Sequence, residues 1–115
     1  IVDFCRINKI PVICFPRNIK KNYVKFAQIV NPDCLSLDYE VDPEWAKDNL
    51  SNYCLQGGVN PNLLFENDET IFKEVDKYLN IFKNHPYIFN LGHGLLPETN
   101  PHTLQKVIER VNNFK

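Results

Sequence analysis

Hydrophobic residues in this chain gather in four short continuous runs separated by longer stretches that mix polar and apolar residues. The runs occupy residues 11–15, 34–37, 53–56 and 87–91. Continuous apolar runs of four or five residues, bounded by turn residues, are typical of strands buried within a parallel sheet. We therefore expect four short strands, and we expect the first and the last of them to be buried.

The stretches between these runs repeat apolar residues at helical spacing. They predict helices over residues 23–30, 43–50, 67–82 and 100–114. Asp42-Pro43 and Asn100-Pro101 each combine a capping side chain with a proline at the first helical position, which is a typical helix start. Leu104, Val107, Ile108, Val111 and Phe114 predict the inner face of the last helix.

Strands that alternate with amphipathic helices predict an α/β fold with a parallel sheet covered on at least one face. Four strand-helix units make either half of an eight-stranded barrel or a small open sheet. Residues 1–8 open without methionine and resemble the end of a helix already under way. We expect one segment over residues 1–115, cut from a longer protein.

Composition excludes several broad classes. The chain has 115 residues, 43% of them hydrophobic, and a formal net charge of −1, so no general field attracts nucleic acid or an anionic membrane. No apolar run is long enough to predict a membrane span. The four cysteines lack C-x-x-C or metal-ligand spacing, which favours free thiols in a reducing compartment such as the cytosol.

Candidate chemistry lies where the expected strands end, because loops at the carboxyl ends of parallel strands converge on one edge of a sheet. Arg17 could bind a substrate carboxylate or be a solvated surface residue. Asp38 could act as a general base, although we favour an acceptor for backbone N–H groups. Gln56-Gly57-Gly58 could admit a ligand or only make a turn.

His93 is the strongest of these candidates. It stands between two glycines in Asn90-Leu91-Gly92-His93-Gly94, after the fourth apolar run, and an imidazole titrates near neutral pH. We expect His85 and His102 to lie on the surface, and three lysines to be solvated (Lys20, Lys21 and Lys25).

Four blocks in this order resemble the C-terminal part of the uroporphyrinogen decarboxylase family: residues 11–17, 35–39, 55–61 and 90–97. The resemblance runs from about Pro11 to the end of the chain, and N-L-G-H-G is its most specific block. Tyr39, Gly58 and Asn60 depart from residues that the family often has, namely tryptophan, asparagine and aspartate. The departures leave the barrel interpretation intact and weaken claims about the third loop.

The resemblance implies the C-terminal half of a TIM-type (β/α)₈ barrel, with the N-terminal half absent from this chain. It also implies cofactor-free, metal-free decarboxylation of the acetate side chains of uroporphyrinogen III to give coproporphyrinogen III in haem biosynthesis. The protonated pyrrole serves as the electron sink, so the enzyme supplies electrostatics and a proton. A cytoplasmic homodimer is implied for the whole protein.

Among the family's substrate-contacting residues, only the histidine of N-L-G-H-G matches a residue here, namely His93. Arg17 is a less certain substrate-binding candidate, and no catalytic residue can be assigned in this segment. The family's R-Q-A-G-R segment, its aspartate under the pyrrole nitrogens, and its cleft tyrosine and serine have no counterpart in this chain. We therefore expect the chain alone to be inactive.

Two other classes remain open. One is a zinc-dependent corrinoid or thiol methyltransferase on a related barrel, but Phe15-Pro16-Arg17-Asn18 lacks the H-x-C ligands that such a site needs. Stoichiometric zinc would favour that class. The other is a non-catalytic binding module, for which replacing His93 would leave porphyrin binding unchanged.

Overall fold

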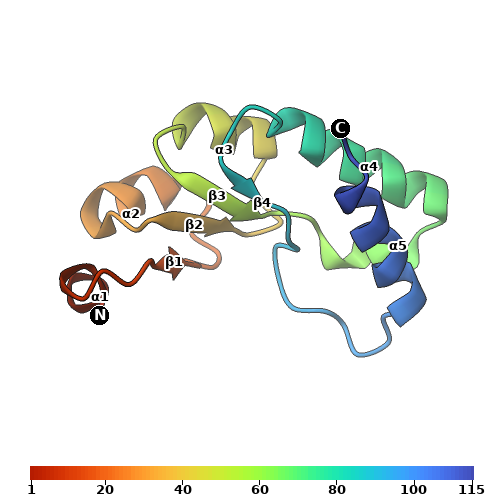
Figure 1. The fold of residues 1–115 in the computed structure, drawn as a ribbon, viewed down its shortest axis with the longest axis horizontal. Helices are drawn as coiled ribbons and strands as arrows, with labels where there is room; N and C mark the ends of the chain where they lie inside the picture. The colour runs from red at the N-terminus through yellow and green to blue at the C-terminus, as the bar shows by residue number, and fades with distance from the viewer.

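A computed structural model describes all 115 residues and shows four parallel strands alternating with helices (Figure 1). The strands are β1 (Ile13–Cys14), β2 (Cys34–Leu37), β3 (Cys54–Gly57) and β4 (Tyr87–Ile88). The α-helices are α1 (Val2–Ile7), α2 (Tyr23–Val30), α3 (Pro43–Asn49), α4 (Asp68–Ile81) and α5 (Pro101–Asn112). Two 3₁₀ turns, η1 (Lys20–Asn22) and η2 (Pro61–Phe65), complete the chain. This confirms the expected α/β class.

The sheet has the strand order β1-β2-β3-β4, so every strand pairs with its neighbour in sequence. The register places Ser36 opposite Gln56 and Gln56 opposite Ile88. β3 begins one residue later than expected, and β4 keeps only two residues of the expected five. Leu91 nevertheless returns to the sheet through an isolated parallel bridge to Val59.

Helices α2, α3 and α4 cover one face of this sheet (Figure 1). Leu35, Leu37 and Leu55 point into that layer and are fully buried. They form one core with six side chains from the three helices and their ends: Tyr23, Ala27, Ala46, Leu50, Tyr78 and Phe82. Val107 brings α5 against α4 in a second, smaller cluster. The main core thus lies between the sheet and its helices, and the smaller cluster lies between α4 and α5.

The opposite face of the sheet is open. Ile13 is 50% exposed, Phe15 43% and Ile88 45%. The expectation that the first and last strands are buried is therefore wrong for this chain, because no helix or strand covers the face to which these side chains point. Only the central strand β2 is buried along its whole length.

The helix boundaries follow the expected capping signals. Asp42 accepts a hydrogen bond from the Trp45 backbone N–H at 2.8 Å, and Asn67 caps α4 in the same way through Thr70. α2 ends at Val30, and the left-handed φ of 49° at the next residue, Asn31, adds to the effect of the following proline. Ile108 was expected on the inner face of α5 but is exposed, because the face that packs on α4 is centred on Val107.

The amino-terminal segment confirms the expected helix, α1, which buries none of its own residues. Four large apolar side chains in and around it are exposed: Ile1, Phe4, Ile7 and Ile10. Arg6 holds the helix near α2 by donating to the Asn31 carbonyl at 3.0 Å. None of the helices has the length and apolar character that crossing a membrane requires.

All four cysteines are free thiols, which confirms the expectation of unpaired cysteines. Cys34 and Cys54 stand opposite each other in the register of β2 and β3. Burial raises the pKa of the Cys34 thiol to about 12, so the thiol stays protonated at neutral pH. Cys34 therefore behaves as the small apolar residue that the sequence predicts.

Candidate functional site

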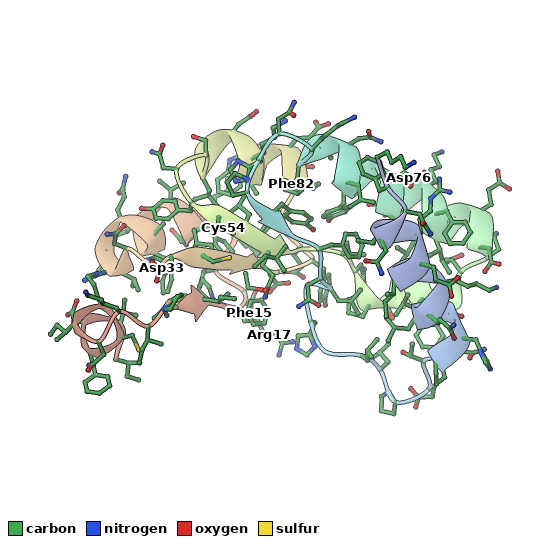
Figure 2. All side chains as sticks on the ribbon, in the orientation of Figure 1. Phe15, Arg17, Asp33, Cys54, Asp76 and Phe82 are labelled. Atoms are coloured by element: carbon green, nitrogen blue, oxygen red, sulfur yellow. The ribbon has the colours of Figure 1, made fainter.

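A hollow of about 460 Å³ opens on the uncovered face, at the carboxyl ends of the strands. Ile13 and Phe15 form its apolar side, and four polar residues line the rest: Ser36, Gln56, Asn90 and His93. Figure 2 labels Phe15 and Arg17 just beyond β1, on the side of the sheet away from α2 and α3. The rule that strand ends converge thus correctly predicted the meeting of Gln56, Asn90 and His93.

The turn that carries His93 is fixed by backbone contacts with two other strand ends. The Gly92 N–H donates to the Val59 carbonyl at 2.7 Å. A side chain at Gly92 would put its Cβ 2.4 Å from the Tyr39 nitrogen, so only glycine fits there. Beside it, the His93 side chain is exposed and faces the hollow. The backbone that carries the imidazole is therefore fixed in position.

Gly57 lies close to the backbone of Leu91, which is a second tight contact beside the His93 turn. Its φ is +77°, and a Cβ there would lie 2.8 Å from the Leu91 carbonyl oxygen. Both facts require glycine, because an L side chain rarely adopts that φ and has no space. Gly57 is therefore required where β3 ends against Leu91, and Gln56, one residue earlier, lines the hollow.

Three tyrosine hydroxyls hold the strand ends from the helix side. Tyr23 donates to the Ser36 carbonyl and accepts from the Asp38 N–H, each at 3.0 Å. Tyr78 donates to the Gly58 carbonyl at 2.8 Å, and Tyr87 to the Gly57 carbonyl at 2.7 Å. Burial raises the pKa of Tyr23 to about 12 and raises the pKa of the other two phenols further. All three remain neutral donors at any ordinary pH.

The sequence analysis gave these tyrosines no role at the strand ends, although Tyr23 and Tyr78 fall within two of the predicted helices. The available signal was that a buried tyrosine needs a partner for its hydroxyl. The partner itself could not be read from the sequence, because each bond spans 13 or more residues.

Asp38 has the structural role that the sequence favoured. Its buried carboxylate accepts the Asn18 N–H at 3.0 Å and the Glu40 N–H at 3.3 Å. These bonds tie the loop after β1 to the loop after β2. A carboxylate committed to backbone donors in this way orders the loop that carries Arg17.

Arg17 lies in a separate hollow of about 340 Å³ that it shares with Asp38, Tyr39 and Glu40. The Arg17 side chain is exposed and makes no ion pair. The two hollows are neighbours, because Tyr39 lines this one and packs against Gly92, which lines the other. A ligand that contacts both Arg17 and His93 must therefore span the Tyr39 backbone.

The expectation of a surface position is correct for His102 and wrong for His85. His102 is exposed, as expected, and so are the three lysines of the α2 region. His85 is half-buried instead: its ring packs against Phe82, and Nε2 lies 2.9 Å from the Tyr53 carbonyl. A carbonyl only accepts, so Nε2 carries the proton and His85 fixes the loop before β4.

The hollow beside His93 has hydrogen-bond donors but no carboxylate. None of its lining residues is an aspartate or glutamate, whereas amide, hydroxyl and imidazole groups are present. No three His, Cys, Asp or Glu side chains of the chain converge as metal ligands would. The arrangement can donate hydrogen bonds to an anionic or carbonyl-rich ligand, and it holds no group suited to general-base catalysis other than His93.

Comparison with known proteins places this geometry in a family. The family model described as uroporphyrinogen decarboxylase matches residues 1–114. A uroporphyrinogen decarboxylase of Rhodobacter capsulatus is 36% identical over 108 residues, covering 92% of this chain and 31% of the relative. One from Paracoccus denitrificans is 37% identical over 103 residues, covering 89% and 30%. One from a Wolbachia strain is 37% identical over 109 residues, covering 95% and 32%.

The chain thus spans about a third of the length of these curated relatives. The match extends through every strand, helix and loop that builds the two hollows. With nearly the whole chain matched by the family model, this protein chain belongs to the uroporphyrinogen decarboxylase family, and its four β-α units are part of a (β/α)₈ barrel.

Proposed function

We propose that this chain forms the C-terminal half of a uroporphyrinogen decarboxylase barrel, completed by an N-terminal half that the chain does not include. The activity would be the removal of carbon dioxide from the acetate side chains of uroporphyrinogen III to give coproporphyrinogen III. The observation that carries the proposal is the hollow beside His93, which is lined by hydrogen-bond donors and by no carboxylate. The strand ends that form it belong to the sequence blocks that resemble the family.

In this proposal His93 contacts a carboxylate of the substrate from the rim of the hollow, and Arg17 contacts another from the neighbouring hollow. A guanidinium and an imidazole suit a polycarboxylate, because each forms charge-assisted hydrogen bonds with carboxylate oxygens. Breaking the bond to carbon dioxide sends an electron pair into the protonated pyrrole, and that step needs a negative group near the pyrrole N–H donors. The hollow has none, so this group must come from the rest of the protein.

We further propose that the chain alone does not decarboxylate and associates with itself, and that the whole protein is a homodimer, which only the family resemblance supports. Half a barrel leaves the outer edges of β1 and β4 unpaired, and exposed strand edges favour association with another chain. Size-exclusion chromatography of the isolated chain should show self-association. The four free thiols support a reducing compartment, the cytosol, as the site of action.

The test uses a fusion enzyme, in which this chain replaces the matching third of the Rhodobacter capsulatus decarboxylase. The fusion should form coproporphyrinogen, and the isolated chain should not. Replacing His93 with alanine should raise KM about tenfold, because a contact to the substrate carboxylate is lost. The matched control is His102→Ala, since His102 is exposed on α5 and lies outside both hollows.

A folded fusion that forms no coproporphyrinogen would contradict the proposed function. If that fusion does not unfold cooperatively on heating, a second fusion built on the Wolbachia relative provides the same comparison. Product formation by the isolated chain would refute the claim that it is inactive alone. A His93→Ala variant with unchanged KM would remove His93 from the substrate site.

A further inference from the structure

We propose that Gln56, together with Ser36, contacts the substrate directly and binds one of its carboxylates at the floor of the hollow below His93. This inference rests on the proposed function and adds two residues to its site. Neither residue was assigned a carboxylate-binding role by the sequence.

The geometry places the pair at the centre of the open face. Ser36 and Gln56 are direct partners in the register of the two central strands. Their neighbours Leu35, Leu37 and Leu55 point into the helix-covered core, so alternation directs Ser36 and Gln56 to the other side. Both residues line the hollow that His93 overlooks.

Hydrogen bonding leaves this pair with donors to spare. The Gln56 amide nitrogen donates to the Ser36 hydroxyl oxygen at 3.1 Å. The amide has two N–H groups and the hydroxyl has one O–H, so this bond uses one of three donors. The remaining N–H and O–H have no acceptor within the chain.

The surroundings favour an anionic ligand. Ile13 and Phe15 make an apolar wall, and no lining residue carries a negative charge that would compete for the free donors. Hydrogen bonds to a charged acceptor are stronger than neutral ones, and strengthen further away from water. A carboxylate is therefore the ligand group that these donors select.

A structural role alone does not account for the pair. Ser36 is 7% exposed even with this face uncovered, and burial of an unpaired donor is unfavourable. If the two residues served only to bond to each other, one N–H and one O–H would have no partner among the residues of this chain. A substrate carboxylate supplies the acceptor that both require.

The test compares two changes of Gln56 in the fusion enzyme. Gln56→Glu keeps the size of the side chain and can accept from the Ser36 hydroxyl, but it turns a negative charge toward the substrate. Gln56→Leu removes the polar group and adds no charge. We expect KM to rise about thirtyfold for Gln56→Glu and about fivefold for Gln56→Leu, with the penalty of the glutamate variant decreasing as salt is raised.

Two further variants serve as a surface control and as a second test of the pair. Gln28→Glu makes the same chemical change on the exposed surface of α2 and should leave KM within about twofold of the unmodified fusion. Ser36→Ala should raise KM about threefold, because one donor is lost. A purely structural pair would show the reverse order, with Gln56→Glu closer to the unmodified fusion than Gln56→Leu.

The outcomes separate this inference from the proposed function. A folded but inactive unmodified fusion contradicts the proposed function. An active fusion in which Gln56→Glu leaves KM within twofold, or harms it less than Gln56→Leu does, overturns the carboxylate contact. If Gln56→Glu fails to unfold cooperatively, Ser36→Ala decides the question, and an unchanged KM for that variant counts against the contact.

Discussion

The two faces of the sheet carry alternate residues of the same strands, yet they differ in almost every physical respect. On the helix side, Leu35 and Leu55 are fully buried in a continuous core. On the other side, Ile13 and Ile88 are about half exposed, and the two central strands present a serine and a glutamine. The helix side holds the fold together, and the open side carries the residues of the proposed substrate site.

The strand ends connect these two faces. Tyrosine hydroxyls from the core side bond to the carbonyls of Ser36, Gly57 and Gly58, so the packing of the helices sets where the strands end on the open side. The comparison teaches that the His93 hollow is only as rigid as the core behind it. Changes on the covered face should therefore alter stability, and changes at the strand ends should alter both stability and the site.

The largest expected effect on stability comes from truncating a side chain on the helix-covered face. Leu55→Ala should lower the free energy of unfolding by about 3 kcal/mol, because it leaves a cavity in a fully buried layer. Ile88→Ala, on the open face of the adjacent strand, should cost less than about 1 kcal/mol. Urea unfolding at one fixed chain concentration measures both, since self-association would otherwise shift the midpoint. Equal losses would abolish the distinction between the faces.

A smaller effect is expected at the strand ends. Gly92→Ala should cost about 2 kcal/mol, because the added Cβ would overlap the Tyr39 backbone and push the His93 turn away. Gly94→Ala is the matched control, since a Cβ there meets nothing within 4 Å. In the fusion enzyme, Gly92→Ala should also raise KM. Similar stability for the two variants would mean that Tyr39 does not hold the turn.

The smallest effect concerns alkaline pH. The pKa of the Tyr23 phenol is raised from 10 to about 12 by burial, so folding favours the protonated form. The stabilisation is fully present below about pH 10 and is lost as pH rises through the folded-state pKa. Between pH 9 and pH 11 the chain should lose on the order of 1 kcal/mol through this group. Urea midpoints across that range should fall less steeply for Tyr23→Phe, and an identical slope would contradict the assignment.

Local patterns predicted most of the elements. α2 and β2 begin and end at the expected residues, because helical spacing of apolar residues and a continuous apolar run are both patterns of neighbouring residues. Asp42 caps α3 as its position before Pro43 predicted. The role of Asp38 was also predictable, because an aspartate at the end of a buried strand lies beside free backbone donors.

The predictions that failed concern contacts between residues far apart in the sequence. Ile13 and Ile88 belong to apolar runs that look the same whether one face or both faces of the sheet are covered, so the sequence could not show that one face is open here. The contact between Gly92 and Tyr39 joins two loops far apart in the chain. Arg17 and His93 share an edge of the sheet but occupy different hollows, a difference of side-chain direction that the strand-end rule does not resolve.

The strand order also bears on how the chain is made. Because β2, β3 and β4 each pair with the strand that precedes them in sequence, that partner has already been synthesised when each of the three emerges. Each new β-α unit can add to the sheet as it leaves the ribosome, with only modest loop-closure entropy at every step. A sheet assembled in this order grows from one edge, and among these four units the one that carries His93 is added after the other three.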